Sequence, residues 1–468
     1  MLFLWCTTGV WAQPPLVLEN PRQFYNISLH AAVYEDTSAR LSLAAVRRAD
    51  SAGRFAPNTQ ALINFGLRKS AVWLRFTLQN RTAEAMLIEI GEPVIDSLAL
   101  FKVAGANHAA LARAGIYRPF DDRPYRTNLF LHDLQLPPGG TGTYYLRVQN
   151  SLPLVLPLRA APLHAFFEYN HISDMLQGAY FGLMLAVAVF IFFIYVLFST
   201  RTYLYYLLYV LFFTGFFAYH KGISHEYLWG DAVWFNRYTS VFATGTYVFA
   251  LLFVHRFLFA KYRLPITKWF KWGLVLLTML AFGLTLTPWR VAGVELLHLT
   301  ALLINLYILL LGVAVSILGY RLGFYFTFVW GLLTASATVF VLQLSNMLPS
   351  NHLTRNAMQL GSATEVILLS FAIAYQINKY RAEKEEAQSE AIRQLKANEQ
   401  MRSRIARDLH DDIGSTLSSI AILSQVAQDR LAQKPDNIRQ LMARISDNSL
   451  KVQDAMSDIV WTTRPDKS

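Results

Sequence analysis

A histidine followed by two carboxylates lies near the carboxyl end of the sequence, in Leu409-His410-Asp411-Asp412. An imidazole is a nucleophile near neutral pH, and a neighbouring carboxylate can orient the ring and raise its reactivity. His410 is therefore a candidate phosphoryl acceptor. A surface histidine with no chemical role is the commoner explanation for such a short cluster. The surrounding elements must therefore show which of the two explanations applies.

Apolar residues around His410 predict a helix that turns this histidine toward solvent, one position off the apolar stripe. A second helix with a heptad seam follows the turn at residues 434–437. The stripe comprises Ile405, Leu409, Ile413, Leu417 and Ile420, and the seam comprises Ile438, Leu441, Ile445, Asn448, Val452, Ala455 and Ile459. A hairpin of two such helices cannot bury its apolar surface alone. We expect two chains to pair in a four-helix bundle over residues 402–468.

Charged helix-forming residues precede this hairpin, over residues 379–401. A weak, partly polar seam recurs there at 3-4 spacing, through Ile377, Tyr380, Lys384, Ala387, Ala391, Leu395 and Asn398. The pattern predicts a coiled coil that continues the last membrane helix, in one unbroken helical segment from Ala357 to about Gln433. A marginal seam can rotate or change register, which suits signal conduction. A plain solvated helix is the alternative.

The segment RSRIARDLHDDIGSTLSSI closely resembles the dimerisation and phosphoacceptor helix of two-component sensor histidine kinases with an LHD motif. DIVWTTRPDKS resembles the helix end that leads into the ATP-binding domain of that family. Residues 21–377 resemble the seven-transmembrane receptors with diverse intracellular signalling modules (7TMR-DISM). Their external half is a β-sandwich often likened to carbohydrate-binding modules, and WLRFTLQN and YYLRVQNSLPLVLPL look like its strands.

This resemblance implies a role for each residue around the histidine. His410 would accept the γ-phosphoryl group of ATP, with Asp411 as the general base. Arg404 and Arg407 would help an acidic response regulator or the phosphate to dock. Ser415 stands where the subgroup commonly has a Gln or His that positions water for dephosphorylating the regulator, so the resemblance does not extend to that phosphatase group.

The family's ATP-binding domain would follow Ser468, and the sequence contains no Gly-rich phosphate loop. We therefore expect a chain shortened at a domain boundary and inactive as a kinase by itself. No cofactor is expected in this chain, and ATP and Mg²⁺ would bind in the following domain. The expected partners are a second copy of the chain, a response regulator, the lipid bilayer and an unidentified small-molecule or carbohydrate ligand.

Apolar stretches near the length of about 20 residues that a bilayer-crossing helix needs recur through residues 177–378. They are Gln177–Phe198, Tyr203–Tyr219, Trp234–Val254, Trp269–Leu286, Val294–Leu318, Phe324–Leu344 and Ala357–Ile377. Basic residues favour one set of loops, with Arg201, Arg256, Lys261, Arg263, Lys268, Lys271 and Arg321 against Lys221, Arg237, Arg290 and Arg355. The seven stretches predict seven spans, and the positive-inside rule predicts that the amino-terminal domain lies outside and the carboxyl terminus inside. The resemblance implies that the membrane is a bacterial inner membrane.

Ionisable residues are few within these stretches. Glu365 lies mid-span in the last one, and Glu295 and His298 open the fifth. An intramembrane carboxylate is costly, which makes it a functional candidate by default, although a neighbouring helix can also satisfy it. A transporter is a weaker interpretation, because no pair of Gly/Pro-broken helices recurs in matching halves.

Residues 21–167 alternate apolar and polar side chains, which predicts half-buried strands of a β-sandwich or jelly roll. Val72, Leu74, Phe76 and Leu78 would face the core, as would Tyr144, Leu146 and Val148. The opposite face carries Trp73, Arg75, Tyr145 and Arg147, a candidate ligand face. An ordinary solvated face is the favoured alternative.

Composition agrees with a membrane protein that has folded domains on both sides. Of 468 residues, 54% are hydrophobic and only 16% are charged, against about 25% in a typical soluble protein. The net charge of +11 is accounted for by the inner loops, so no nucleic-acid partner is expected. Cys6 is the sole cysteine, which excludes a disulfide framework and a cysteine zinc site, and no metal site is expected. Residues 1–12 resemble the end of a signal peptide, and a short buried strand is the alternative.

Together these features predict a homodimeric membrane sensor kinase, in which an external or membrane signal controls phosphorylation of His410 and transfer to a response regulator. The alternative is a membrane receptor or scaffold that signals through its coiled coil without phosphorylation.

Overall fold

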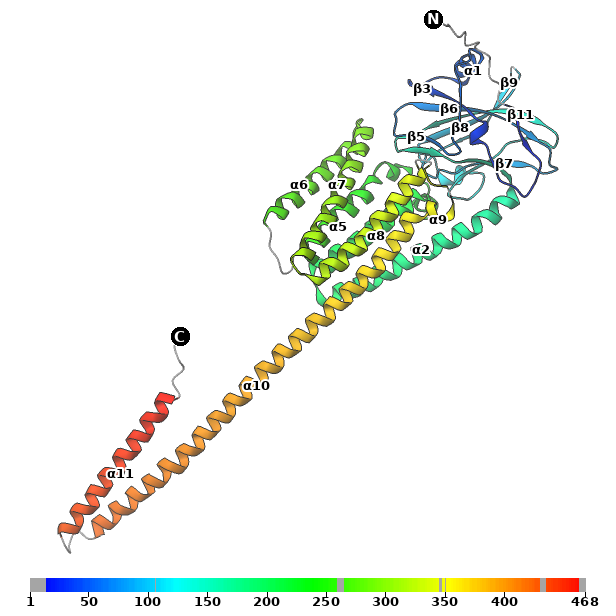
Figure 1. Cartoon of the computed structure of the whole chain (residues 1–468). Helices are drawn as coiled ribbons and strands as arrows, with labels where there is room; N and C mark the ends of the chain where they lie inside the picture. Colours follow the sequence, from blue (N-terminus) through cyan, green and yellow to red (C-terminus); the bar gives the residue numbers. More distant parts are fainter. Residues whose placement is uncertain are drawn as a thin grey trace. The chain divides into compact units, whose positions relative to one another are not determined.

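The computed structural model describes residues 14–105, 107–258, 265–344, 347–349, 351–429 and 435–462 (Figure 1). The chain divides into two compact units, Met1–Ala372 and Ile373–Ser468. The first unit holds a β-rich domain followed by a helical domain, and the second holds a helical hairpin. The predicted signal-peptide remnant at residues 1–12 lies outside the described residues.

The β-rich domain is built on two main sheets. One has the strand order β4-β3-β6-β11-β8-β9 with β1 added parallel to β6, the other has the order β10-β7-β13-β2, and β12 pairs with β5. The strands are β1 (Leu16–Leu18), β2 (Tyr25–Asn26), β3 (Ala32–Asp36), β4 (Ala56–Pro57), β5 (Ile63–Gly66), β6 (Ala71–Asn80), β7 (Met86–Ile90), β8 (Ser97–Ala104), β9 (Asn107–Ala114), β10 (Phe130–Asp133), β11 (Thr141–Gln149), β12 (Leu154–Leu156) and β13 (Leu158–Pro162). The domain begins earlier than predicted, because β1 precedes Pro21.

The core between the two sheets follows the predicted alternation. Leu74 and Phe76 of β6 pack with Leu146 of β11 and with Ile88 of β7 in one buried cluster. The buried hydroxyl of Tyr144 donates to the backbone oxygen of Leu134, 2.8 Å away. The alternation therefore predicted correctly which side of these strands is internal.

Helix α1 (Leu43–Ser51) is an element that the sequence analysis did not predict. Ser42 caps its first turn by accepting from the backbone N–H of Ala45. Leu43 and Val46 are buried against the outer face of the larger sheet. The helix therefore covers a sheet face that was expected to be open.

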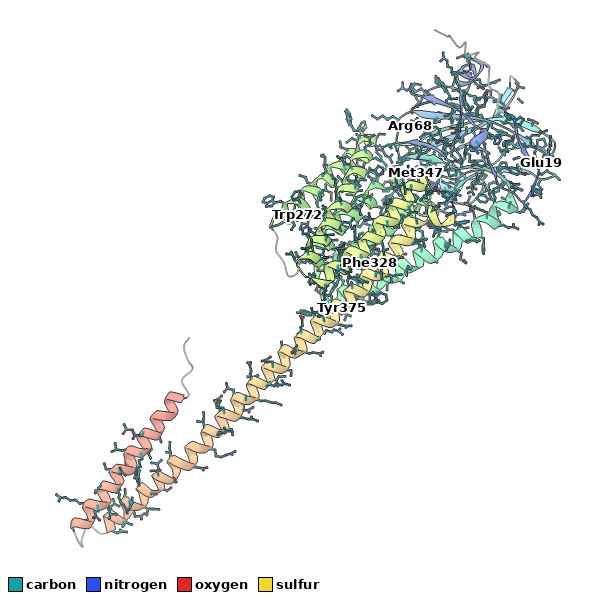
Figure 2. The ribbon with its side chains drawn as sticks, viewed as in Figure 1. Glu19, Arg68, Trp272, Phe328, Met347 and Tyr375 are labelled. Carbon is teal, nitrogen blue, oxygen red and sulfur yellow. The ribbon has the colours of Figure 1, made fainter. Side chains whose placement is uncertain are left out.

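Long apolar helices make up the rest of the first unit. They are α2 (Leu163–Phe198), α3 (Arg201–His220), α5 (Ser240–Leu258), α6 (Pro265–Thr285), α7 (Arg290–Ile317), α8 (Arg321–Leu344) and α10 (Ala357–Asp429). Short helices α4 (Ile223–Tyr227) and α9 (His352–Arg355) lie between them. Among the described residues, six helices are long and apolar enough to cross a membrane, and these are the helices above without α6. Figure 2 shows Trp272 on α6 and Phe328 on α8, both half or more exposed, as side chains in contact with lipid would be.

The starts of the first and third spans differ most from the prediction, and the other starts differ by at most four residues. The first helix begins at Leu163 rather than Gln177, directly after β13, so no loop separates the β-rich domain from α2. The third begins at Ser240 rather than Trp234, because Trp234 belongs to the short 3-10 helix Val233–Arg237. There, the buried side chain of Asn236 donates to the backbone oxygen of Ile116, 2.6 Å away, and so ties this segment to the β-rich domain.

In the second unit, helix α10 continues to Asp429 and α11 (Pro435–Thr462) runs back beside it (Figure 1). The uninterrupted helix predicted from Ala357 is confirmed as far as Asp429, and the remainder up to Gln433 lies outside the described residues. The turn is placed correctly, since α11 starts at Pro435, where proline suits the first helical position.

Candidate functional site

The candidate phosphoacceptor lies in the α10 part of the hairpin. The backbone of His410 is helical, and its side chain lies outside the described residues. Asp411 and Ser415, one and five positions later, are exposed, as are Arg404 and Arg407 in the preceding turns. The structure thus places these four residues on an accessible stretch of one helix, where a partner domain can reach them.

The hairpin buries one face of each helix. On α11, the residues of the predicted seam are half-buried while their neighbours are exposed; they are Ile438, Leu441, Ile445, Asn448, Val452 and Ala455. On α10, Ile405, Ile413 and Ile420 are half-buried as predicted, but Leu417 is 51% exposed. Leu417 was predicted to face the hairpin core. A single hairpin leaves it uncovered because two helices cannot enclose both sides of a broad apolar stripe.

The candidate ligand face of the β-rich domain is brought together but covered. Trp73 pairs with Arg147 across strands β6 and β11, and Arg75 pairs with Tyr145. Helix α1 packs on this face, so that Trp73 and Tyr145 are buried.

Polar contacts to α1 and to the segment before it fix this arrangement. Asp50 of α1 accepts from Arg75 at 2.7 Å and from the Tyr145 hydroxyl at 2.5 Å. Arg147 donates to the backbone oxygen of Ala39 at 2.8 Å. The face is therefore neither open to a ligand nor solvated, and a ligand would have to displace α1 to reach Trp73. The spacing of Leu43, Val46 and Ala49 was the signal for this helix.

Glu365 is fully buried between the membrane helices. One carboxylate oxygen accepts from the hydroxyl of Tyr209 on α3 at 2.9 Å, and the other has no hydrogen-bond partner among the described residues. Glu295 and His298 are exposed on α7. The three ionisable residues predicted within the spans therefore do not form one site, and Glu365 is at least partly satisfied by a neighbouring helix.

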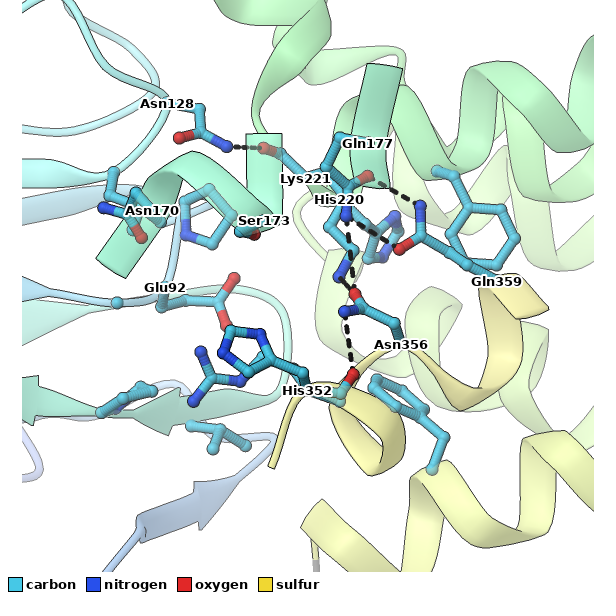
Figure 3. Close-up of a pocket in the computed structure, with 18 of the residues that line it drawn as sticks. Glu92, Asn128, Asn170, Ser173, Gln177, His220, Lys221, His352, Asn356 and Gln359 are labelled. Carbon is cyan, nitrogen blue, oxygen red and sulfur yellow. Dashed lines mark hydrogen bonds between the residues drawn. The ribbon is translucent and has the colours of Figure 1, made fainter. Parts of the chain in front are cut away.

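A cavity of about 240 Å³ lies where the β-rich domain meets the helical domain (Figure 3). Its walls come from the loop after β7, the start of α2, the end of α3, the end of α8, and the segment from α9 into α10. Polar and ionisable side chains are concentrated here: Glu89, Glu92, Asn128, Arg159, Asn170, Ser173, Asp174, Gln177, His220, Lys221, His352, Arg355, Asn356 and Gln359. The sequence analysis counted Lys221 and Arg355 only as loop charges and did not find this site.

Hydrogen bonds join the helices at this cavity. Gln177 of α2 and Gln359 of α10 donate to each other through their side-chain amides, at 3.1 and 2.9 Å. Lys221 donates to the side-chain oxygen of Asn356 at 3.0 Å, and Asn128 of the β-rich domain donates to the backbone oxygen of Lys221 at 2.8 Å (Figure 3). The cavity is therefore a junction that connects the β-rich domain, α3 and the beginning of α10.

Burial perturbs the charges at this junction. It raises the pKa of Glu92 to about 8 and lowers the pKa of Lys221 to about 8, because a charged group loses hydration there. Nearby Arg355 lowers the pKa of Lys221 further, while Glu92 opposes that change. Perturbed groups gathered in a cavity are a recognised indication of a functional site.

Family models match three consecutive parts of the chain. The model described as 7TMR-DISM extracellular 2 matches residues 28–161, the model for 7TM diverse intracellular signalling matches residues 173–376, and the histidine kinase model HisKA_3 matches residues 402–468. By these domains, the chain belongs to the 7TMR-DISM sensor histidine kinases. No curated protein matches the chain significantly.

The domain matches assign the parts of this sensor kinase. The β-rich domain is its external domain, the apolar helices are its membrane domain, and the hairpin carrying His410 is its HisKA_3 phosphoacceptor domain. The resemblance predicted from the LHD motif and from the strand motifs is confirmed. The cavity in Figure 3 lies between the first two of these domains.

Proposed function

We propose that this protein is a homodimeric sensor kinase of the bacterial inner membrane that detects an external or membrane signal and controls phosphorylation of His410. An imidazole nitrogen of His410 would attack the γ-phosphorus of ATP. The new N–P bond replaces the bond from that phosphorus to the bridging oxygen of ADP, and Asp411 takes the imidazole proton. The phosphoryl group would then pass to a response regulator. ATP and Mg²⁺ would be held by a separate ATP-binding domain.

The observation that carries this proposal is helix α10. It begins at Ala357, beside the cavity residues Asn356 and Gln359, and it includes His410 in the same helix. A shift or rotation at its beginning would change how His410 is presented to an ATP-binding domain. The exposed positions of Arg404, Arg407 and Asp411 support docking of acidic or catalytic partners there.

Seven membrane passes are part of the proposal, with α6 as the additional one. Ser240, the first residue of α5, contacts Thr285 at the end of α6 through hydroxyl groups 2.8 Å apart. At the other end of α5, His255 contacts the Tyr307 hydroxyl at 2.6 Å, and this hydroxyl donates to the backbone oxygen of Thr267 in the first turn of α6. The two ends of α6 thus lie level with the two ends of α5. This supports a membrane crossing by α6 at the same depth as that of α5. Lys268 and Lys271 then lie at its cytoplasmic end, as the positive-inside rule requires.

Dimerisation is supported by apolar side chains that one chain leaves uncovered. In the hairpin, Leu417, Met442, Leu450 and Met456 are each more than half exposed. A second hairpin would cover such a face in a four-helix bundle.

The test of the proposed function is phosphorylation of the full chain, in membranes, by an added ATP-binding domain of an LHD-type kinase with radiolabelled ATP. Wild type and His410→Gln are compared, with His108→Gln as a control for an exposed histidine on the external domain. Acid-labile label on wild type and on His108→Gln, and none on His410→Gln, is expected. Equal signalling by His410→Gln in a cell that carries the complete system would instead favour the non-phosphorylating scaffold.

A further inference from the structure

Apart from the junction cavity of Figure 3, an outer groove of about 570 Å³ lies where the end of α6 and the starts of α5 and α7 meet the external domain. Its volume is within the range of about 300–1,000 Å³ that is usual for small-molecule sites. Two arginines, three aromatic residues and two threonines line it: Tyr117, Trp234, Arg237, Tyr238, Thr285, Thr287 and Arg290. None of these described lining residues has a carboxylate, so the outer groove presents positive charge and aromatic surface.

Each arginine of the outer groove has a neutral partner. Arg290, the first residue of α7, donates to the hydroxyl of Tyr117, and its guanidinium carbon lies 6.0 Å from the centre of that ring. Arg237 donates to the backbone oxygen of Leu286 at 3.3 Å. In the described part of the chain, neither arginine forms an ion pair with a carboxylate. A guanidinium group carries five N–H donors, so both arginines can donate to a further acceptor in the groove.

One carboxylate lies near these arginines. Burial raises the pKa of the Tyr117 hydroxyl, and the positive charges of Arg290 and Arg237 oppose that change. Asp96 raises the same pKa, so this carboxylate is also near the hydroxyl. It accepts from the backbone N–H of Ser151 at 2.8 Å and does not line the groove. Two positive charges therefore stand against one negative charge, and the negative charge lies outside the groove.

The outer groove lies at the external end of the membrane helices. Tyr117 belongs to the external domain, and α5 and α7, which begin beside the groove, are among the helices long and apolar enough to cross a membrane. Trp234, Tyr238 and Trp289 are exposed there by 66%, 42% and 66%. Tryptophan and tyrosine concentrate at the level of the lipid headgroups. We therefore expect headgroups of the external leaflet beside the groove.

The orientation of the chain does not explain the two arginines. The positive-inside rule places basic residues at the cytoplasmic ends of membrane helices, and this groove is at the opposite end. A local partner is therefore the better explanation for two arginines in one external groove. The planar guanidinium group matches phosphate, because it can donate two parallel hydrogen bonds to it. A phosphodiester is the anionic group that phospholipids present at this depth.

We propose that the outer groove binds the phosphate of an anionic phospholipid, with phosphatidylglycerol as the model, between Arg237 and Arg290. The exposed rings of Trp234 and Tyr238 would contact the glycerol and the first acyl carbons, since each ring has a polar and an apolar end. The lipid would connect the segment before α5, the start of α7 and, through Tyr117, the external domain. This binding is independent of the proposed kinase activity.

The test counts phosphatidylglycerol bound to the full chain in dodecyl maltoside by native mass spectrometry along a lipid titration. Wild type should show a saturable site. Arg290→Gln should weaken binding at this site about tenfold, which corresponds to about 1.4 kcal/mol, and Arg237→Gln should weaken it about threefold or more. The unfolding temperature of each variant without lipid is measured as well. If Arg290→Gln lowers that temperature because the contact with Tyr117 is lost, the comparison of Arg237→Gln with wild type decides.

The matched control is Arg321→Gln. Arg321 is exposed and, like Arg290, is the first residue of a long apolar helix, but α8 begins at the predicted cytoplasmic side. The control should bind phosphatidylglycerol within about twofold of wild type, because a single exposed charge contributes little. An equal loss of binding in the control would mean that any arginine at a helix end attracts headgroups, and it would overturn the proposal.

Two further titrations identify the source of the phosphate. Phosphatidylcholine should bind at least about threefold more weakly than phosphatidylglycerol, because its choline cation would be repelled by two guanidinium groups. Excess glycerol 3-phosphate should not displace the lipid. Displacement by glycerol 3-phosphate would assign the groove to a soluble phosphate ester and would overturn the proposal. Equal binding of phosphatidylcholine, or wild-type affinity in both Arg290→Gln and Arg237→Gln, would overturn it too.

Discussion

Two parts of helix α10 have the same secondary structure but opposite surroundings. Between Ala357 and Ala372, inward-facing polar side chains make hydrogen bonds to neighbouring helices, through Gln359 to α2, Ser362 to α2 and Glu365 to α3. From Asn378 to Arg404, every residue is exposed in the single chain. The first part is held by neighbouring helices, whereas no side chain of the second part is buried.

The difference shows which contacts the chain supplies by itself and which it leaves to a partner. The hydrogen bonds of the first part have specific geometry and only modest strength, about 0.6 kcal/mol each on average within membranes. A set of such hydrogen bonds can exchange partners at a small cost in free energy. The second part exposes Ile392 and Leu395 by 53% and 70%, which is expected of a helix whose apolar face is covered in a dimer.

The largest expected effect concerns the exposed part. Leu395→Asp should weaken dimerisation of the full chain, because burial of a leucine contributes roughly 1.5–3 kcal/mol and a dimer loses two of them. The measurement is the monomer–dimer equilibrium in detergent by analytical ultracentrifugation. Ala397→Asp is the control, since it lies about 200° around the helix from Leu395. Equal dimerisation of both variants would mean that this part is a plain solvated helix, the alternative considered from the sequence.

A smaller effect is expected where the first part of α10 packs against α8. A side-chain carbon at Gly361 would lie 1.8 Å from the hydroxyl oxygen of Ser336 and 2.5 Å from its Cβ, so rotation of the serine cannot relieve the clash. Gly361→Ala should therefore destabilise the membrane domain by about 1–3 kcal/mol.

Gly331→Ala on α8 is the matched control for this substitution, since nothing lies within 4 Å of the added carbon. It should be neutral or stabilise by up to about 1 kcal/mol through helix propensity. Thermal unfolding in detergent measures both variants. If both substitutions stabilise the membrane domain, or both destabilise it, α10 does not approach α8 closely at Gly361.

The sequence predicted the elements whose residues repeat at a fixed period. The alternation in β6 and β11 identified the core face, and the heptad seam of α11 identified its buried face. The same reasoning failed where one element covers another, because Trp73 and Arg75 look solvent-facing until α1 is placed on them. Nothing in the period of β6 indicates that helix.

The junction cavity was missed for a related reason. Glu92, Lys221 and Asn356 are far apart in the sequence, and each looks like an ordinary loop or helix-end residue. Only the packing of the external domain on the ends of α3 and α10 brings them together. A local pattern cannot contain that information, whereas the LHD segment, whose function depends on adjacent residues, was identified from the sequence and confirmed by the HisKA_3 match.

The smallest effect tests whether Glu365 is a structural or a signalling group. Tyr209→Phe removes the hydroxyl that donates to Glu365 at 2.9 Å, and it should cost about 0.6 kcal/mol and at most about 1.7 kcal/mol of membrane-domain stability. Glu365→Gln keeps an oxygen that can accept from Tyr209, so its stability should change less. The same thermal unfolding assay measures both single variants and the double variant.

The double variant distinguishes the two roles of Glu365. If the carboxylate only satisfies Tyr209, the effects of the two substitutions on stability should not add, and phosphorylation of His410 should be the same in all three variants. Altered phosphorylation in Glu365→Gln with unchanged stability would instead make Glu365 part of the signal path along α10. The hydrogen-bonded part of α10, with Gln359, Ser362 and Glu365, would then transmit the signal, in addition to having surroundings that differ from those of the exposed part.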